Sequence, residues 1–211
     1  MKYAWTIAAV TAAFLLAAPK VGAARPSHAN VPLFARFASD GTRLRSYVVP
    51  VHANITVHKV ISIRARLAGN MRYAKPDRLL LTLNRVSPEQ RRVFARIATP
   101  RAWPQFYNLH LLRTVSINGR KHYMIRGTPQ NPSDPVDHLV ADVPDGATPV
   151  LYAQWFLRGK GTITMHIQTA TVNGYVLPVR NQTDINVPGY RVHADVNYGH
   201  YDLRDTRVSL R

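Results

Sequence analysis

The side chains that could carry out catalysis are few and widely spaced in this chain. The sequence contains no cysteine, and it lacks both the G-x-S-x-G and the H-E-x-x-H motifs. Glu89 is the only glutamate, and it lies in the first turn of a predicted helix, where the helix dipole stabilises a carboxylate. Asp134 and Asp137 could pair, but they lie in a proline-rich loop, where solvation by water is the favoured interpretation. The sequence therefore predicts a protein that is not an enzyme.

The nine histidines do not have the spacing of metal ligands. His52 and His58 would share one face of a strand, but six residues of extended chain separate them too far to bind one ion. His193 and His200 would lie on opposite faces of a regular strand. The sequence therefore predicts no metal site and no cofactor.

The chain is strongly basic, with 28 Lys and Arg against 11 Asp and Glu and a net charge of +17. Such a charge favours anionic partners, for example phospholipid head groups, envelope polymers or nucleic acid. Aromatic residues next to arginines, as at Tyr190-Arg191, are also found on surfaces that stack nucleic-acid bases. A basic surface that is simply solvated is an equal alternative. The export signal described next argues against nucleic acid as the partner.

Residues 1–24 are typical of a secretory signal peptide. Lys2 precedes an apolar run at 4–18, and small residues at 21–24 suit cleavage after Ala23 or Ala24. The run is shorter than the roughly 20 apolar residues of a membrane-spanning helix, although an uncleaved anchor is the alternative. We expect an exported protein with one domain over residues 25–211, because no linker or change of composition interrupts that stretch.

Alternation of apolar and polar residues predicts a sheet. The pattern is clearest over residues 161–201, where Asn173-Gly174 and Pro188-Gly189 supply turns between three strands. Similar segments begin at residue 44, and Pro50 in the first of them indicates an edge strand or a bulge. About ten strands are expected in total. Two short helices are expected as well, over residues 26–39 and after Ser87, which makes the class mainly β with a minor helical part (α+β).

Several strands would place large apolar side chains on one face. Trp155 follows this pattern, as do Ile163 and Met165 on the next strand. Such a face either lines a cavity for an apolar ligand or packs as a filled core, and periodicity alone does not distinguish the two.

Four segments, taken together and in order, resemble the outer-membrane lipoprotein-sorting superfamily, the LolA/LolB-like carriers. They are SYVVPVHANITVHK at 46–59, LAGNMRYAKPDRLLLTL at 67–83, SINGRKHYMIRGTP at 116–129 and ATVNGYVLPVR at 170–180. The resemblance implies a strongly curved antiparallel sheet that forms an unclosed barrel lidded by helices. It also implies a periplasmic, non-catalytic carrier that holds acyl chains of lipids or lipoproteins in an apolar cavity.

Strand parity and this resemblance together predict the residues that line the cavity. On the sheet they are Ile61, Ile63, Leu79, Leu81, Leu109, Leu111, Trp155, Ile163 and Met165, and on the lid they are Phe34, Phe94 and Trp103. The alternative function is an envelope interaction or stress-sensing protein on the same scaffold. It would bind an anionic membrane surface or an envelope protein through a basic face that includes Arg64 and Arg66.

Overall fold

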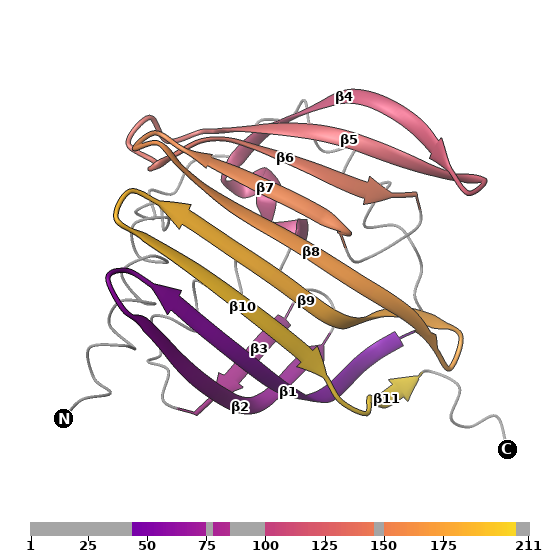
Figure 1. Cartoon of the computed structure of the whole chain (residues 1–211). Coiled ribbons are helices and arrows are strands. Elements are labelled where there is room, and N and C mark those ends of the chain that lie inside the picture. Colours follow the sequence, from indigo (N-terminus) through magenta and orange to yellow (C-terminus); the bar gives the residue numbers. More distant parts are fainter. Residues whose placement is uncertain (1–43, 75–77, 85–99, 146–149, 206–211) are drawn as a thin grey trace, which may run out of the picture.

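The computed structural model describes residues 44–74, 78–84, 100–145 and 150–205 (Figure 1). In these residues the chain forms eleven strands of one sheet and a short 3-10 helix, η2 (Pro100–Gln105). The strands are β1 (Leu44–His58), β2 (Ser62–Ala74), β3 (Arg78–Leu83), β4 (Tyr107–Ile117), β5 (Arg120–Pro129), β6 (Val136–Pro144), β7 (Tyr152–Leu157), β8 (Gly161–Val172), β9 (Tyr175–Val187), β10 (Tyr190–Tyr198) and β11 (Asp202–Asp205).

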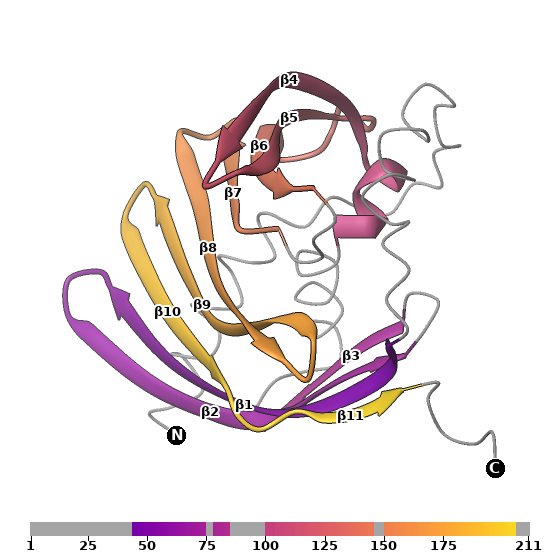
Figure 2. The same ribbon diagram turned by 90° about the vertical axis from the view of Figure 1, so that its right-hand side faces the viewer.

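The strands are antiparallel throughout and lie in the order β3-β2-β1-β10-β9-β8-β7-β6-β5-β4. Most neighbouring strands in the sheet are also successive in the sequence. The exception in this order is the pairing of β1 with β10, which brings the first described strand beside one near the C-terminal end of the described residues. Strand β11 extends the same edge of β1 beyond β10. The sheet curves strongly, and its edge strands β3 and β4 do not pair with each other (Figure 2). The expected antiparallel, unclosed barrel is therefore confirmed.

Two tight turns have the conformation that their Asn-Gly sequences predict. Asn118 and Gly119 have φ values of 50° and 75°, and Asn173 and Gly174 have values of 50° and 81°. Two consecutive positive φ angles match the right-handed twist of the strands that such a turn connects. The turn before β10 uses Gly189 at φ 91°, a conformation that a side chain would disfavour. These local signals set the register of three hairpins.

Other expectations need revision. The sequence predicted about ten strands, and it missed β11 and the short helix η2. The two predicted helices, over residues 26–39 and after Ser87, lie outside the described residues, so a helical lid remains a prediction. The ligand cavity beneath such a lid remains a prediction for the same reason.

The sequence predicted an edge strand or a bulge at Pro50, and the edge strand is wrong because β1 is paired on both sides. Strand β1 pairs with β10 from Val51 onward and with β11 up to Val48. Pro50 lies in the gap between those two ladders, where its carbonyl oxygen accepts a hydrogen bond from the Gly199 amide at 2.8 Å. Proline has no amide hydrogen to donate, and at this position neither β10 nor β11 pairs with β1, so no ladder hydrogen bond is lost.

The sheet has one apolar and one polar face. Along β1 the side chains of Val51, Ala53, Ile55 and Val57 are buried, and His52 between them is exposed. The apolar face is the concave one, because it meets η2 on the inside of the curve (Figure 2). The convex face carries the polar half of each strand, as the period of two requires.

Candidate ligand-binding face

A row of buried side chains crosses the concave face from β1 to β4, and we call it the large row. Each member is the cross-strand partner of the next, and no side chain in the row is more than 4% exposed. The row consists of Val57, Val192, Ile185, Ile163, Trp155, Leu139, Gly127 and Leu109. It extends over eight strands and contains no polar side chain, so it forms a continuous apolar strip.

Gly127 is the one member of the large row without a side chain, and the structure explains why. A Cβ atom at this position would lie 2.9 Å from Leu109 Cδ2 and 2.9 Å from Leu139 Cγ. The two leucines therefore close over the glycine, and the absence of a Cβ allows β4, β5 and β6 to pack here.

A second row lies beside the large row and has smaller side chains, so we call it the small row. It follows the same cross-strand pairing and runs through Ile55, Ala194, Thr183, Met165, Ala153, Ala141 and Ile125. Ala153 and Ala141 are fully buried, and Ala194 is 9% exposed. Alanines on three strands bring the sheet backbone close to whatever packs above it.

Two tryptophans meet over this face. Trp103 of η2 lies edge-on to Trp155 of the large row, with 5.8 Å between ring centroids and 83° between ring planes. Both side chains are buried, at 1% and 3% exposure. An edge-to-face pair of this kind adds about 0.5–1.5 kcal/mol to the burial of the rings. The contact holds η2 against the concave side of the sheet.

A cluster of tyrosines occupies the end of the face near β11. Tyr47 stacks on Tyr73 at 5.2 Å and meets Tyr201 edge-on at 5.3 Å. The Tyr201 hydroxyl donates a hydrogen bond of 2.5 Å to the Pro178 carbonyl. Burial raises the pKa of Tyr47 and Tyr201 well above the usual value, and it raises the pKa of Tyr198 to about 12. The hydroxyls of Tyr47, Tyr198 and Tyr201 are therefore neutral at physiological pH.

Tyr190, at the opposite end of β10, differs from these tyrosines. Its hydroxyl oxygen is buried but has no hydrogen-bond partner, the one such side-chain atom in the described part of the chain. Its ring packs against the apolar core beside β9, where Val187 is its cross-strand partner. Burial raises the pKa of this hydroxyl. An unsatisfied buried donor costs free energy and is available to a hydrogen-bond acceptor that arrives with a ligand.

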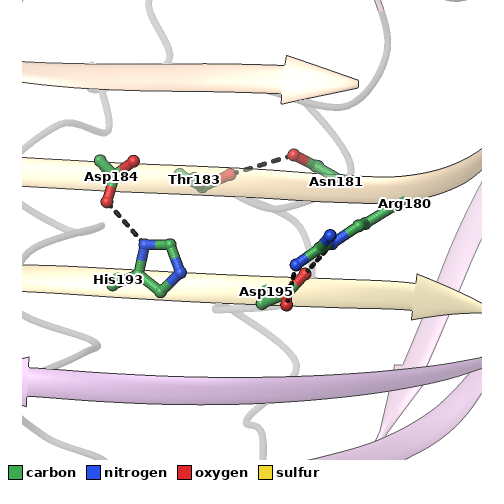
Figure 3. Close-up of polar contacts among 6 residues, drawn as sticks. All are labelled: Arg180, Asn181, Thr183, Asp184, His193 and Asp195. Atoms are coloured by element: carbon green, nitrogen blue, oxygen red, sulfur yellow. Dashed lines mark hydrogen bonds and ion pairs between the residues drawn. The ribbon is translucent and has the colours of Figure 1, made fainter. Parts of the chain in front are cut away.

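The convex face carries hydrogen-bonded charge pairs between β9 and β10 (Figure 3). Arg180 contacts both carboxylate oxygens of Asp195, at 2.8 and 2.7 Å, and this hydrogen bonding lowers the pKa of Asp195. His193 Nδ1 lies 2.7 Å from Asp184 Oδ1. Both carboxylates are thus engaged within the protein.

The two aspartates considered for acid–base chemistry do not form a pair. Asp134 is 2% exposed, and its carboxylate accepts a hydrogen bond from the Val136 amide at 2.9 Å. Asp137 contacts His138 Nδ1 at 2.7 Å, and this hydrogen bond is the main reason that the pKa of Asp137 is lowered. Each carboxylate therefore has its own structural partner.

No group of three or more His, Asp or Glu side chains could hold a metal ion in the part of the chain that the structure describes. Within residues 44–74, 78–84, 100–145 and 150–205, no helix has both the length and the apolar character needed to span a membrane.

The structure brings five of the predicted cavity residues together on the concave face. These buried residues are Trp103, Leu109, Trp155, Ile163 and Met165. Ile63 is half-buried. Leu79 and Leu81 lie on β3, where their side chains are not described, and Phe34 and Phe94 lie outside the described residues. Arg64 and Arg66 are exposed on β2, as expected.

One predicted cavity residue, Ile61, does not line the concave face, and another, Leu111, lies on that face but remains partly exposed. Ile61 is 69% exposed because it lies in the turn between β1 and β2, before β2 begins at Ser62. Leu111 is the cross-strand partner of Ile125 on the concave side, but it is 46% exposed because β4 is an edge strand. Of the small row, the predicted cavity set contained only Met165, although strand parity could have found the other members.

The open sheet with one apolar face has the LolA-like fold, as comparison with solved structures shows. A LolA superfamily protein from Nitrosomonas europaea has a TM-score of 0.50 at 16% identity, over 82% of this chain and 93% of that one. A DUF1329 family protein from Desulfovibrio piger has a TM-score of 0.55 at 12% identity, over 88% and 96%. A domain described as that of an outer-membrane lipoprotein-sorting protein, from Vibrio parahaemolyticus, has a TM-score of 0.50 at 10% identity, over 84% and 92%.

The resemblance inferred from the four sequence segments is therefore confirmed at the level of the fold. No protein-family model and no curated protein sequence matches the chain. At these identities, the structural likeness defines the class of fold and leaves the ligand to be argued from the concave face itself.

Proposed function

We propose that this protein is a non-catalytic carrier or binding module of the periplasm, which holds acyl chains of lipids or lipoproteins against its concave face. The observation that carries the proposal is the large row, a continuous apolar strip across an open sheet. The small row beside it contains alanines, whose short side chains would let a ligand approach the sheet backbone. The fold shared with a lipoprotein-sorting domain supports the same ligand class.

The hydrophobic effect would supply the affinity. Each methylene group transferred from water contributes about 0.8 kcal/mol to the binding free energy. The many methylene groups of one long acyl chain would therefore give a strongly favourable binding free energy. A ligand buried so deeply would leave slowly unless the covering segments moved. Neither binding nor release needs a catalytic residue, which agrees with the scattered acidic and histidine side chains.

Tryptophan fluorescence gives a direct test, because the chain has three tryptophans and Trp5 lies in the predicted signal peptide. In a protein that starts at residue 25, only Trp103 and Trp155 remain, and both lie at the proposed site. A fatty acid brominated along its chain should quench them, and the same fatty acid without bromine should reverse the quenching. Organic extraction of the purified protein followed by lipid mass spectrometry should find a co-purified lipid. Absence of both signals would contradict the proposal.

A substitution in the small row distinguishes a ligand site from a filled core. Ala153→Leu adds bulk at a fully buried position, and Thr164→Leu adds it on the convex side of β8 as a matched control. In a ligand site, Ala153→Leu should weaken fatty-acid binding and leave stability within about 1 kcal/mol of the parent protein. In a filled core, overpacking should cost about 1–3 kcal/mol and no binding should be seen in either protein.

The proposed location follows from residues 1–24. We expect cleavage after Ala23 or Ala24, so N-terminal sequencing of the protein exported by a Gram-negative host should begin at residue 24 or 25. Retention of residues 1–23 in an exported protein would favour the uncleaved anchor instead.

The second candidate is an envelope interaction or stress-sensing protein on the same scaffold. The observation that favours it is the exposure of Arg64 and Arg66 on the convex side of β2. In this case Arg64→Glu with Arg66→Glu should abolish capture of a protein partner, and fatty-acid quenching of the tryptophans should be absent.

A further inference from the structure

The turn between β1 and β2 exposes two large aliphatic side chains. Val60 is 93% exposed and Ile61 is 69% exposed, the highest values among the large hydrophobic residues of the described chain. Burial of either side chain would be favourable. Two adjacent exposed aliphatic side chains at the end of a hairpin therefore indicate an interaction site. We call residues Lys59, Val60 and Ile61 the hairpin tip.

The hairpin tip is held in shape by its own base. His58 and Ser62 are the last cross-strand pair, and His58 Nδ1 lies 2.7 Å from the Ser62 hydroxyl oxygen. Within the tip, the Lys59 amide donates a hydrogen bond of 3.2 Å to the Ile61 carbonyl. The two aliphatic side chains are therefore presented to the outside by an ordered turn at the end of two long strands.

The hairpin that carries the tip is basic and contains no acidic residue. Strands β1 and β2 with their turn contain no Asp and no Glu, and their five Lys and Arg side chains are all exposed: Arg45, Lys59, Arg64, Arg66 and Arg72. Arg191 of β10 is also exposed and lies opposite His58, at the same end. Lys59, Arg64, Arg66 and Arg191 are the cations of this group nearest the tip, and no carboxylate on the hairpin offsets their charge.

Other turns at this end of the sheet have the same character. The β9–β10 and β7–β8 turns lie at the end that bears the hairpin tip (Figure 1). Arg158 and Lys160 of the β7–β8 turn are exposed. The carboxylates of Asp184 and Asp195 on the convex face are bonded to His193 and Arg180, as described above. This end therefore combines an apolar projection with exposed cations, and the nearby carboxylate of Asp137 is bonded to His138.

We propose that the hairpin tip docks the protein on an anionic phospholipid bilayer. Val60 and Ile61 enter the boundary between head groups and acyl chains, and the surrounding Lys and Arg side chains contact the lipid phosphates. Aliphatic side chains favour the acyl boundary, and cations are attracted to the negative surface of the leaflet. Docking of this kind does not depend on a ligand in the concave face.

The experiment uses the protein from residue 25 onward and sedimentation with vesicles. Vesicles of phosphatidylcholine with 30% phosphatidylglycerol serve as the anionic surface, and pure phosphatidylcholine vesicles serve as the neutral one. We expect binding to the anionic vesicles, at least about tenfold weaker binding to the neutral ones, and a loss of affinity as salt rises. Equal binding to both vesicles, or no binding to either, would overturn the proposal.

Two pairs of variants separate insertion from adsorption by charge. Val60→Ser with Ile61→Ser should lower affinity for anionic vesicles at least about tenfold, because two aliphatic side chains no longer enter the bilayer. Leu112→Ser with Ile117→Ser is the matched control, since both side chains are exposed on the edge strand β4, and it should leave affinity unchanged. Arg64→Gln with Arg66→Gln should lower affinity about tenfold. If only the arginine variant has an effect, the tip does not insert and the proposal is wrong.

A label gives a direct view of the tip. The chain has no cysteine, so Val60→Cys provides a single site for an environment-sensitive dye, and Leu112→Cys provides the control. The label at position 60 should shift to the blue with anionic vesicles, and the label at position 112 should not. A label at position 60 that does not respond to vesicles would overturn the proposal and leave the hairpin available to a protein partner.

Discussion

Removal of one oxygen atom should have opposite effects at two tyrosines, and this comparison tests the hydrogen-bond description of the concave face. Tyr190→Phe removes a buried hydroxyl that has no partner. An unsatisfied buried donor costs about 1–3 kcal/mol, and we take the lower end because the Tyr190 ring is partly exposed. We therefore expect the free energy of unfolding to rise by about 1 kcal/mol, which corresponds to an increase in Tm of about 2–4 °C for a chain of this size.

Tyr201→Phe removes a hydroxyl that donates to the Pro178 carbonyl at 2.5 Å. The substitution loses the hydrogen bond and leaves the carbonyl with one acceptor site unfilled, so we expect a loss of about 1–2 kcal/mol. Tyr152→Phe is the control on the convex face, where the hydroxyl donates to Gln154 Oε1 at 2.8 Å. A loss below about 1 kcal/mol is expected there, because water can replace the partner.

Urea unfolding of solvent-extracted protein measures all three changes, with the slope of the transition unchanged. Extraction matters because a bound lipid could accept a hydrogen bond from Tyr190 and reverse the sign. A Tyr190→Phe variant that is less stable than the parent protein after extraction would refute the reasoning. It would mean that the Tyr190 hydroxyl has a partner and that the end of the face near β9 is hydrated or occupied.

Three further outcomes are expected. Gly127→Ala should lower the free energy of unfolding in urea by about 1–3 kcal/mol, because the new Cβ would lie 2.9 Å from two leucine side chains. Gly159→Ala is the control and should change the free energy of unfolding little, because no atom lies within 4 Å of its Cβ position. Gly174→Ala should cost about 1 kcal/mol, because φ is 81° there, and a parent-like midpoint would show that the turn adopts another conformation. The contribution of the buried tyrosines to stability should be constant below pH 10. It should fall as pH rises from 10 toward 12, since the unfolded chain ionises its tyrosines near pH 10 whereas the folded chain holds the pKa of Tyr198 at about 12. Urea midpoints that do not change between pH 9.5 and 11.5 would contradict the last expectation.

Local chemistry determined the parts of this fold that depend on neighbours in sequence. The Asn-Gly pairs predicted hairpins at 118–119 and 173–174 because those residues tolerate the positive φ angles that such turns require. Alternation of residue types predicted which side chains share a face, and it placed Trp155, Ile163 and Met165 together correctly. Four degenerate segments in order were sufficient to predict the LolA-like fold.

Only the tertiary structure decided which face is concave, which strands meet across the chain, and which apolar residues remain outside. The pairing of β1 with β10 joins residues about 140 positions apart, and no local pattern encodes such a contact. Parity assigned Ile61 to the interior, but the turn ends β1 at His58 and exposes Ile61 instead. The alternation of apolar and polar residues along a strand distinguishes its two faces but does not show which face is covered. Burial of a face depends on segments from other parts of the chain that pack against it.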